Sequence, residues 1–167
     1  AEGGVISGEQ FVDECQVESD LELLLPATYV TGSSERMLLY RELDSLTLDK
    51  DVEDFRTRLI DRFGPIPSET EELLRIVPLR RLAARLGAEK VFLKGGRMSL
   101  FFVSNPDSPY YQSQAFGKVI AYMMKYTRRC DLREQNTRRS MLVKDVKNVE
   151  TAVSVLQEIV AMQVEEG

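Results

Sequence analysis

Apolar and polar residues alternate near the start of the chain, whereas further on the apolar residues recur every three or four positions. The odd positions before Pro26 hold Cys15, Val17, Leu21, Leu23 and Leu25. Residues two apart share one face of a strand, so this spacing predicts a strand near residues 15–25 that ends at the proline. The preceding segment, 1–14, is polar and contains glycines, and we expect it to be a lead-in from a preceding domain.

Two helices are predicted next, because the apolar residues then follow the period of a helix. The first begins at Gly32-Ser33-Ser34, where serine offers capping chemistry, and continues to about Leu46. We expect Asp49 to cap the second helix, whose apolar stripe ends at Gly64 before a proline. A glycine followed by proline is a common helix stop.

A third helix is predicted from a capping box at Ser68-Glu69-Thr70-Glu71 to a C-terminal glycine, Gly87. Pro78 lies inside its apolar stripe and should kink the helix or split it in two. The spacing of the arginines places Arg81 and Arg85 on the face opposite the leucines.

The rest of the chain predicts two strand pairs and two helices. Gly95-Gly96 separates the apolar runs 91–93 and 98–103, which favours a β-hairpin. A helix of about 15 residues should follow Pro109, capped by Asp107 or Ser108. The remaining elements are strands at 128–134 and 138–144 and a final helix capped by Asn148.

The predicted order is one strand, three helices, a hairpin, a helix, two strands and a helix. Helices and hairpins fall in separate groups, which favours an α+β fold over a doubly wound parallel sheet. We predict one domain at 15–167, because a chain of 167 residues with 43% hydrophobic residues can bury a core without a disulfide or metal. The chain begins without methionine, and we expect it to be a piece of a longer protein.

Composition argues against an enzyme. The chain has no histidine, so it cannot form a Ser-His or Cys-His pair. Its two cysteines, Cys15 and Cys130, are far apart, and we interpret them as buried thiols of a cytoplasmic protein rather than metal ligands or a disulfide. Gly95-Gly96 lacks the spacing of a phosphate-binding loop. We therefore expect no cofactor and no metal, and the absence of a long apolar stretch predicts no membrane span.

The charge pattern leaves two readings open. The formal net charge of −5 argues mildly against a general nucleic-acid binder. Arginines nevertheless cluster at 75–85, 125–133 and 138–139, which fits either solvated faces or contacts with an acidic protein or nucleic acid. The aromatic residues Phe92, Phe101 and Phe102 lie in apolar runs, and we expect no aromatic and basic RNA-recognition surface there.

Several strings resemble the C-terminal domain of bacterial transcription-repair coupling factors (Mfd). They are Arg36–Arg41, Leu59–Pro65 with Pro67, Leu79–Ala83 and Leu86-Gly87. The resemblance covers most of the chain from about residue 15, and the last third fits by its layout of elements.

The resemblance implies a regulatory role without catalysis. The full-length family protein is an ATP-dependent DNA translocase in nucleotide excision repair that displaces stalled RNA polymerase and recruits UvrA. Its terminal domain packs on the UvrB-like module of the same protein and masks UvrA binding. The motor motifs do not occur in this chain.

The resemblance also suggests where contact occurs. In the family, two acidic residues one turn apart before the Arg-Phe-Gly string face arginines of the UvrB-like module. Here the second is Asp61, but the first position holds Arg58, a reversal of charge. Either the partner surface has changed with it or the contact lies elsewhere. Our candidates for protein interaction are Arg58, Asp61, Arg62 and Arg81. The alternative function is an accessory nucleic-acid-binding module that uses the arginine clusters.

Overall fold

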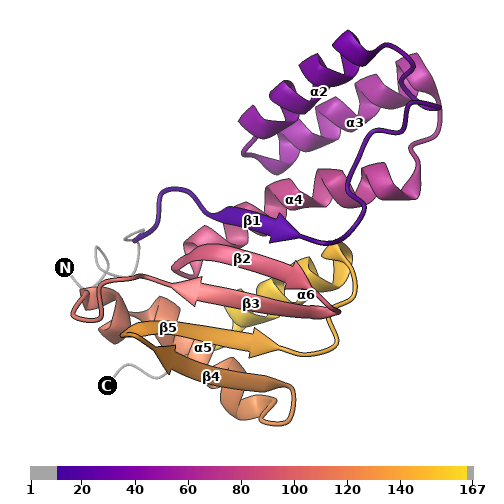
Figure 1. The fold of residues 1–167 in the computed structure, drawn as a ribbon. Coiled ribbons are helices and arrows are strands. Elements are labelled where there is room, and N and C mark those ends of the chain that lie inside the picture. Colours follow the sequence, from indigo (N-terminus) through magenta and orange to yellow (C-terminus); the bar gives the residue numbers. More distant parts are fainter. Residues whose placement is uncertain (1–10, 165–167) are drawn as a thin grey trace.

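The computed structural model describes residues 11–164 and has an α+β fold, as the sequence predicts (Figure 1). Its elements, in chain order, are β1 (Gln16–Ser19), α2 (Ser33–Ser45), α3 (Asp49–Phe63), α4 (Ser68–Arg85), β2 (Ala88–Lys94), β3 (Arg97–Phe102), the 3-10 helix η1 (Pro109–Gln112), α5 (Gln114–Lys125), β4 (Cys130–Gln135), β5 (Arg138–Val143) and α6 (Val149–Ala161).

The five strands form one mixed sheet in the order β1-β2-β3-β5-β4. Strand β1 runs parallel to β2, and the other neighbours are antiparallel. Helices α4, α5 and α6 lie against one face of the sheet (Figure 1). That face supplies the buried residues Val91, Leu93, Met98, Leu100, Phe102, Met141 and Val143.

The buried residues form two separate hydrophobic cores. The larger lies between the sheet and the second half of α4, α5 and α6. The smaller lies among α2, α3 and the first half of α4, where it includes Leu74 and Val77. Helix α4 runs through Pro78 without a break, so the prediction that the proline could split the helix in two is wrong. Packing on both cores offsets the hydrogen bond that proline cannot donate.

The first predicted strand is much shorter than expected. Only Gln16–Ser19 pairs with β2. The backbone N–H of Asp20 still donates to the carbonyl of Leu93, and its carboxylate then accepts from Gly95 N. Beyond this point the chain leaves the sheet, and Leu25 enters the smaller core. The alternation up to residue 25 therefore reflects burial against two cores rather than a continuous strand.

Helix α2 begins within the predicted string Gly32-Ser33-Ser34, but the side-chain caps expected for α3 at Asp49 and for α4 at Ser68 are wrong. The cap positions are occupied by Gly32, Leu48 and Pro67, none of which forms a side-chain capping bond. The expected capping groups have other partners: Asp49 binds Arg81, and Glu71 binds Arg56. Tertiary ion pairs have thus taken the carboxylates that local capping would use.

Other local predictions are confirmed. The Asn148 side chain accepts the N–H of Thr151 and caps α6. Gly64 and Gly87 end their helices with φ angles of 88° and 85°, which glycine adopts without steric cost. The predicted helix after Pro109 forms two pieces, because Ser108 caps η1 and Ser113 caps α5.

Part of the predicted lead-in lies outside the described residues, namely 1–10. Residues that follow it contact the larger core. Val12 is buried, and the ring of Phe11 lies 5.5 Å from that of Tyr110. The boundary at residue 14 and the single domain at 15–167 stay predictions.

Candidate interaction surface on helices α2 and α3

Three of the four predicted interaction residues lie on one flank of α3. Arg58, Asp61 and Arg62 are exposed and stand three or four residues apart, so they are neighbours on the helix surface. Helices α2 and α3 form a pair at the end of the molecule distant from the sheet (Figure 1). The fourth residue, Arg81, comes from α4 and binds the connection between α2 and α3. Its guanidinium is 2.8 Å from the Asp49 carboxylate and 3.2 Å from the Thr47 carbonyl.

The two arginines of α3 pair with carboxylates of α2. Arg58 binds Glu42, and Arg62 binds Glu35. Arg58 donates a hydrogen bond to Glu42, and this bond raises the pKa of Arg58. Desolvation opposes the rise, and the charges of Glu42 and Asp54 add to it. Exposed ion pairs of this kind contribute less than about 1 kcal/mol each, so they orient the guanidinium groups more than they stabilise the fold.

Asp61 differs from its neighbours. Its carboxylate is exposed and has no hydrogen bond or ion pair within residues 11–164. Asp54, two turns earlier on the same side of α3, is also exposed. This flank of α3 therefore presents one carboxylate on each side of Arg58. The charge of Arg58 itself is balanced by Glu42 of α2.

A small groove separates the helices next to these charges. Its volume is about 160 Å³, and its lining consists of Leu39, Phe55, Arg58, Leu59, Arg62 and Phe63. The guanidinium of Arg58 lies 5.4 Å from the ring centre of Phe55, and that of Arg62 lies 4.9 Å from Phe63. An apolar floor with a charged rim rich in arginine is typical of protein–protein interfaces.

Exposed apolar side chains extend this surface along α2. Leu38 is 62% exposed and Met37 is 58% exposed. Leu38 lies three residues after Glu35 and four before Glu42, so it borders both ion pairs on the helix surface. Large exposed apolar residues beside a groove indicate a contact surface more strongly than scattered ones do.

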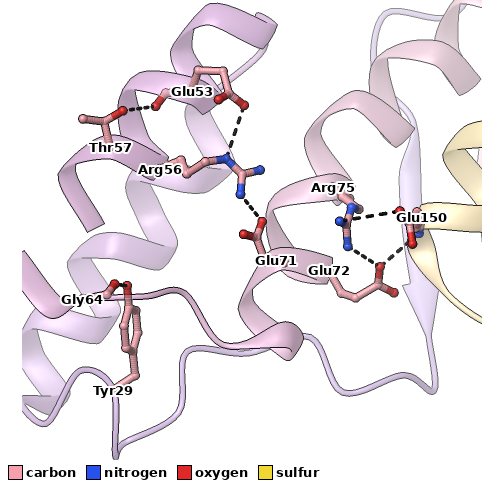
Figure 2. A network of polar contacts seen from close by, with 9 residues as sticks. All are labelled: Tyr29, Glu53, Arg56, Thr57, Gly64, Glu71, Glu72, Arg75 and Glu150. Atoms are coloured by element: carbon pink, nitrogen blue, oxygen red, sulfur yellow. Dashed lines mark hydrogen bonds and ion pairs between the residues drawn. The ribbon is translucent and has the colours of Figure 1, made fainter. Parts of the chain in front are cut away.

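Polar contacts hold α3 in place beneath this surface (Figure 2). Arg56, on the flank of α3 opposite Arg58, binds Glu71 of α4 and lies 3.4 Å from Glu53. The Tyr29 hydroxyl donates to the Gly64 carbonyl at 2.8 Å. These contacts fix both the helix and the turn that follows it.

The arginine clusters are largely engaged within the chain. In the first cluster, Arg75 lies 2.9 Å from Glu72, Arg80 lies 3.9 Å from Asp44, and Arg81 binds Asp49. In the second, Arg129 donates to two backbone carbonyls. Local partners thus occupy several of the side chains that the nucleic-acid alternative requires.

The two cysteines are free and buried. Burial raises the pKa of Cys15 to about 12, opposed by the charge of Arg80, and burial also raises the pKa of Cys130. Within residues 11–164 there is no group of three metal-ligating side chains. None of the helices in that range combines the length and apolarity that a membrane span requires.

Sequence reasoning missed three residues of this surface, Glu35, Glu42 and Asp54. The first two stand seven residues apart, which places them on one side of a helix. That spacing could have suggested a pair of acids, but not that α3 would supply their partners. Asp54 and Asp61 have the same spacing on α3.

Comparisons with known proteins all identify the same family. Residues 19–113 match the TRCF domain family. A transcription-repair-coupling factor from Rickettsia bellii is 30% identical over 132 residues, which are 78% of this chain and 11% of the relative. The one from Escherichia coli is 32% identical over 78 residues, 47% of this chain and 7% of the relative. A crystal structure of the C-terminal domain of transcription-repair coupling factor has the same fold, with a TM-score of 0.67 and 17% identity, over 88% of this chain and 93% of the other. The chain thus spans about a tenth of the length of the first relative.

Proposed function

The chain belongs to the TRCF domain family, the C-terminal domain of transcription-repair coupling factors, and we propose that it is a non-catalytic clamp. It packs on the UvrB-like module of its parent protein and masks the site where UvrA binds. The parent is an ATP-dependent translocase of the cytoplasm that contacts RNA polymerase and DNA, and the clamp opens when these are engaged.

The observation that carries this proposal is the surface of α2 and α3. It combines a groove, exposed apolar side chains and a carboxylate, Asp61, without a partner in the described part of the chain. A clamp that opens must hold by only a few kcal/mol, because its ligands have to shift the equilibrium between two states. Small apolar contacts with charged groups at the rim suit that requirement.

The pairing of Arg58 with Glu42 supports one resolution of the charge reversal. Since α2 balances the guanidinium of Arg58, this residue need not meet a changed partner. We assign the contact with a cationic side chain of the UvrB-like module to Asp61, with Asp54 as the second carboxylate. Leu38 and the groove would contact apolar residues of the same module.

Titration of this chain with the isolated UvrB-like module tests the proposal. We expect binding by the unmodified chain and a loss of at least about tenfold for Asp61→Arg, since unlike charges would become like charges. Asp107→Arg is the matched control, because Asp107 is also exposed but lies in the loop after β3. Equal binding by all three chains contradicts the assignment to α3, and no binding by any of them contradicts the clamp.

A further inference from the structure

The face of the sheet opposite helices α4, α5 and α6 is not covered by any element within residues 11–164 (Figure 1). Cross-strand partners share a face, so the register identifies its residues. Phe92 pairs with Ser99, Lys90 with Phe101, and Phe101 with Ser140. All of these alternate with residues of the larger core and therefore point away from it.

Two aromatic rings lie side by side at the centre of this open face. Phe92 on β2 and Phe101 on β3 have ring centres 5.4 Å apart and are nearly perpendicular. Both rings are half-buried. Strand alternation places Phe92 and Phe101 on the face opposite Phe102, which is fully buried.

Basic side chains surround the two rings. The Lys90 and Lys94 ammonium groups lie 5.5 and 5.1 Å from the centre of Phe92, and the Arg138 guanidinium lies 5.7 Å from Phe101. Arg97 and Arg133 lie on the same face by register. Acids lie near these five cations: Glu18, Glu89 and Asp131 pair with four of them, Asp13 and Glu14 line a hollow with Lys90 and Arg138, and Asp20 binds the turn after β2.

The acids hold most of these cations weakly. Glu18 lies 3.7 Å from Lys90 and 4.0 Å from Lys94, and Asp131 lies 3.8 Å from Arg133. Pairs this long at the surface contribute little and give way readily to a more highly charged partner. The contact between Arg138 and Glu89 is closer, at 3.1 Å.

A hollow of about 470 Å³ adjoins Phe101 at the end of the β4–β5 hairpin. Its lining includes the amides of Gln135 and Asn136 and the hydroxyls of Thr137 and Ser140. Arg138 also lines it, and its Nε is buried without a hydrogen-bond partner among residues 11–164.

We propose that the open face of the sheet binds single-stranded nucleic acid. Bases stack on Phe92 and Phe101, Lys90, Lys94 and Arg97 contact the phosphates, and the hollow beside Arg138 receives the edge of a base. Stacking requires unpaired bases, whereas cations alone would serve a duplex or an acidic protein equally well. The two adjacent rings therefore favour a single strand over those partners.

Fluorescence anisotropy of this chain with a labelled oligothymidylate of about 12 nucleotides, at about 50 mM salt, tests the proposal. We expect micromolar binding that is tighter for the single strand than for a duplex of the same length. Phe92→Leu and Phe101→Leu should each weaken it about 5- to 150-fold, while Phe→Tyr at either position should retain it, because tyrosine keeps the flat ring. Lys50→Ala, which removes an exposed cation at the start of α3, is the control and should bind as the unmodified chain does.

Thermal unfolding of each variant separates loss of binding from loss of the fold. Several outcomes overturn the proposal: no binding of the single strand at low salt, equal affinity for the duplex or for polyglutamate, or leucine and tyrosine variants that bind alike. The assay contains neither UvrA nor the UvrB-like module, so its result is independent of the clamp.

Discussion

Replacing Gly87 by alanine should destabilise the protein much more than the same change at Gly95. Both glycines have positive φ angles, 85° and 62°, so both substitutions incur the strain of a left-handed residue, about 1–2 kcal/mol. At Gly95 an added Cβ meets nothing within 4 Å. At Gly87 it would lie 2.1 Å from Cε1 and 2.4 Å from Cζ of Tyr110.

Tyr110 cannot readily move away from an added methyl group. Its side chain is fully buried, its hydroxyl donates to the Leu86 carbonyl, and its ring contacts Phe102 and Phe116. Overpacking in such a site costs about 1–3 kcal/mol. We therefore expect a total loss of about 2–5 kcal/mol for Gly87→Ala, which lowers Tm by about 4–20 °C in a chain of this size.

Urea and thermal denaturation of Gly87→Ala and Gly95→Ala measure this difference. Tyr110→Leu removes the two ring atoms closest to the new methyl group, so the double variant Gly87→Ala with Tyr110→Leu should lose less stability than the sum of its single changes. Equal losses for the two glycine variants, or full additivity in the double variant, would refute the argument that Tyr110 sets the cost.

Three further changes test other parts of the structure. Thr70→Val removes a fully buried hydroxyl that donates to the Leu24 carbonyl at 2.8 Å; it should cost about 1–3 kcal/mol in urea denaturation, and an unchanged midpoint would contradict that bond. Glu72 accepts the N–H groups of Val149 and Glu150 at 2.6 and 3.1 Å, and Glu72→Gln should cost about 1 kcal/mol and speed hydrogen exchange in the first turn of α6; unaltered exchange there would count against this cap. Burial raises the pKa of Cys15 from 9.0 to about 12, so the folded thiol stays protonated where the unfolded one ionises. Its contribution to stability is complete below about pH 9 and is lost as the pH rises towards 12, a decline that Cys15→Ala should reduce in pH-dependent denaturation; identical pH profiles for the two chains would contradict the shift.

Local patterns were sufficient for much of the fold. The Asn148 cap and the helix ends at Gly64 and Gly87 follow from residues next to one another in the chain, and so does the Gly95-Gly96 turn. The predicted caps at Ser68 and Asp49 failed because partners from other helices took the carboxylates. Such competition depends on tertiary packing, which periodicity does not describe.

The same holds for the candidate surfaces, where local spacing predicts part of each surface and tertiary packing decides the rest. Spacing alone places Arg58, Asp61 and Arg62 on one flank of a helix. It cannot show that α2 neutralises both arginines, while the Asp61 carboxylate has no ion pair within residues 11–164. Likewise, the apolar run at 98–103 does not show which of Phe101 and Phe102 is buried. That depends on which face of the sheet the helices cover.

The affinity of the parent protein for UvrA tests the clamp most directly. It should be measured for the full-length protein, for the same protein without this domain, and for full-length Asp61→Arg, with Asp107→Arg as the control. We predict that deletion tightens UvrA binding about 5- to 150-fold, the range of typical coupling energies, that Asp61→Arg tightens it in the same direction, and that Asp107→Arg leaves it unchanged. Equal affinity of UvrA for all four proteins would contradict the proposal that this domain masks its site.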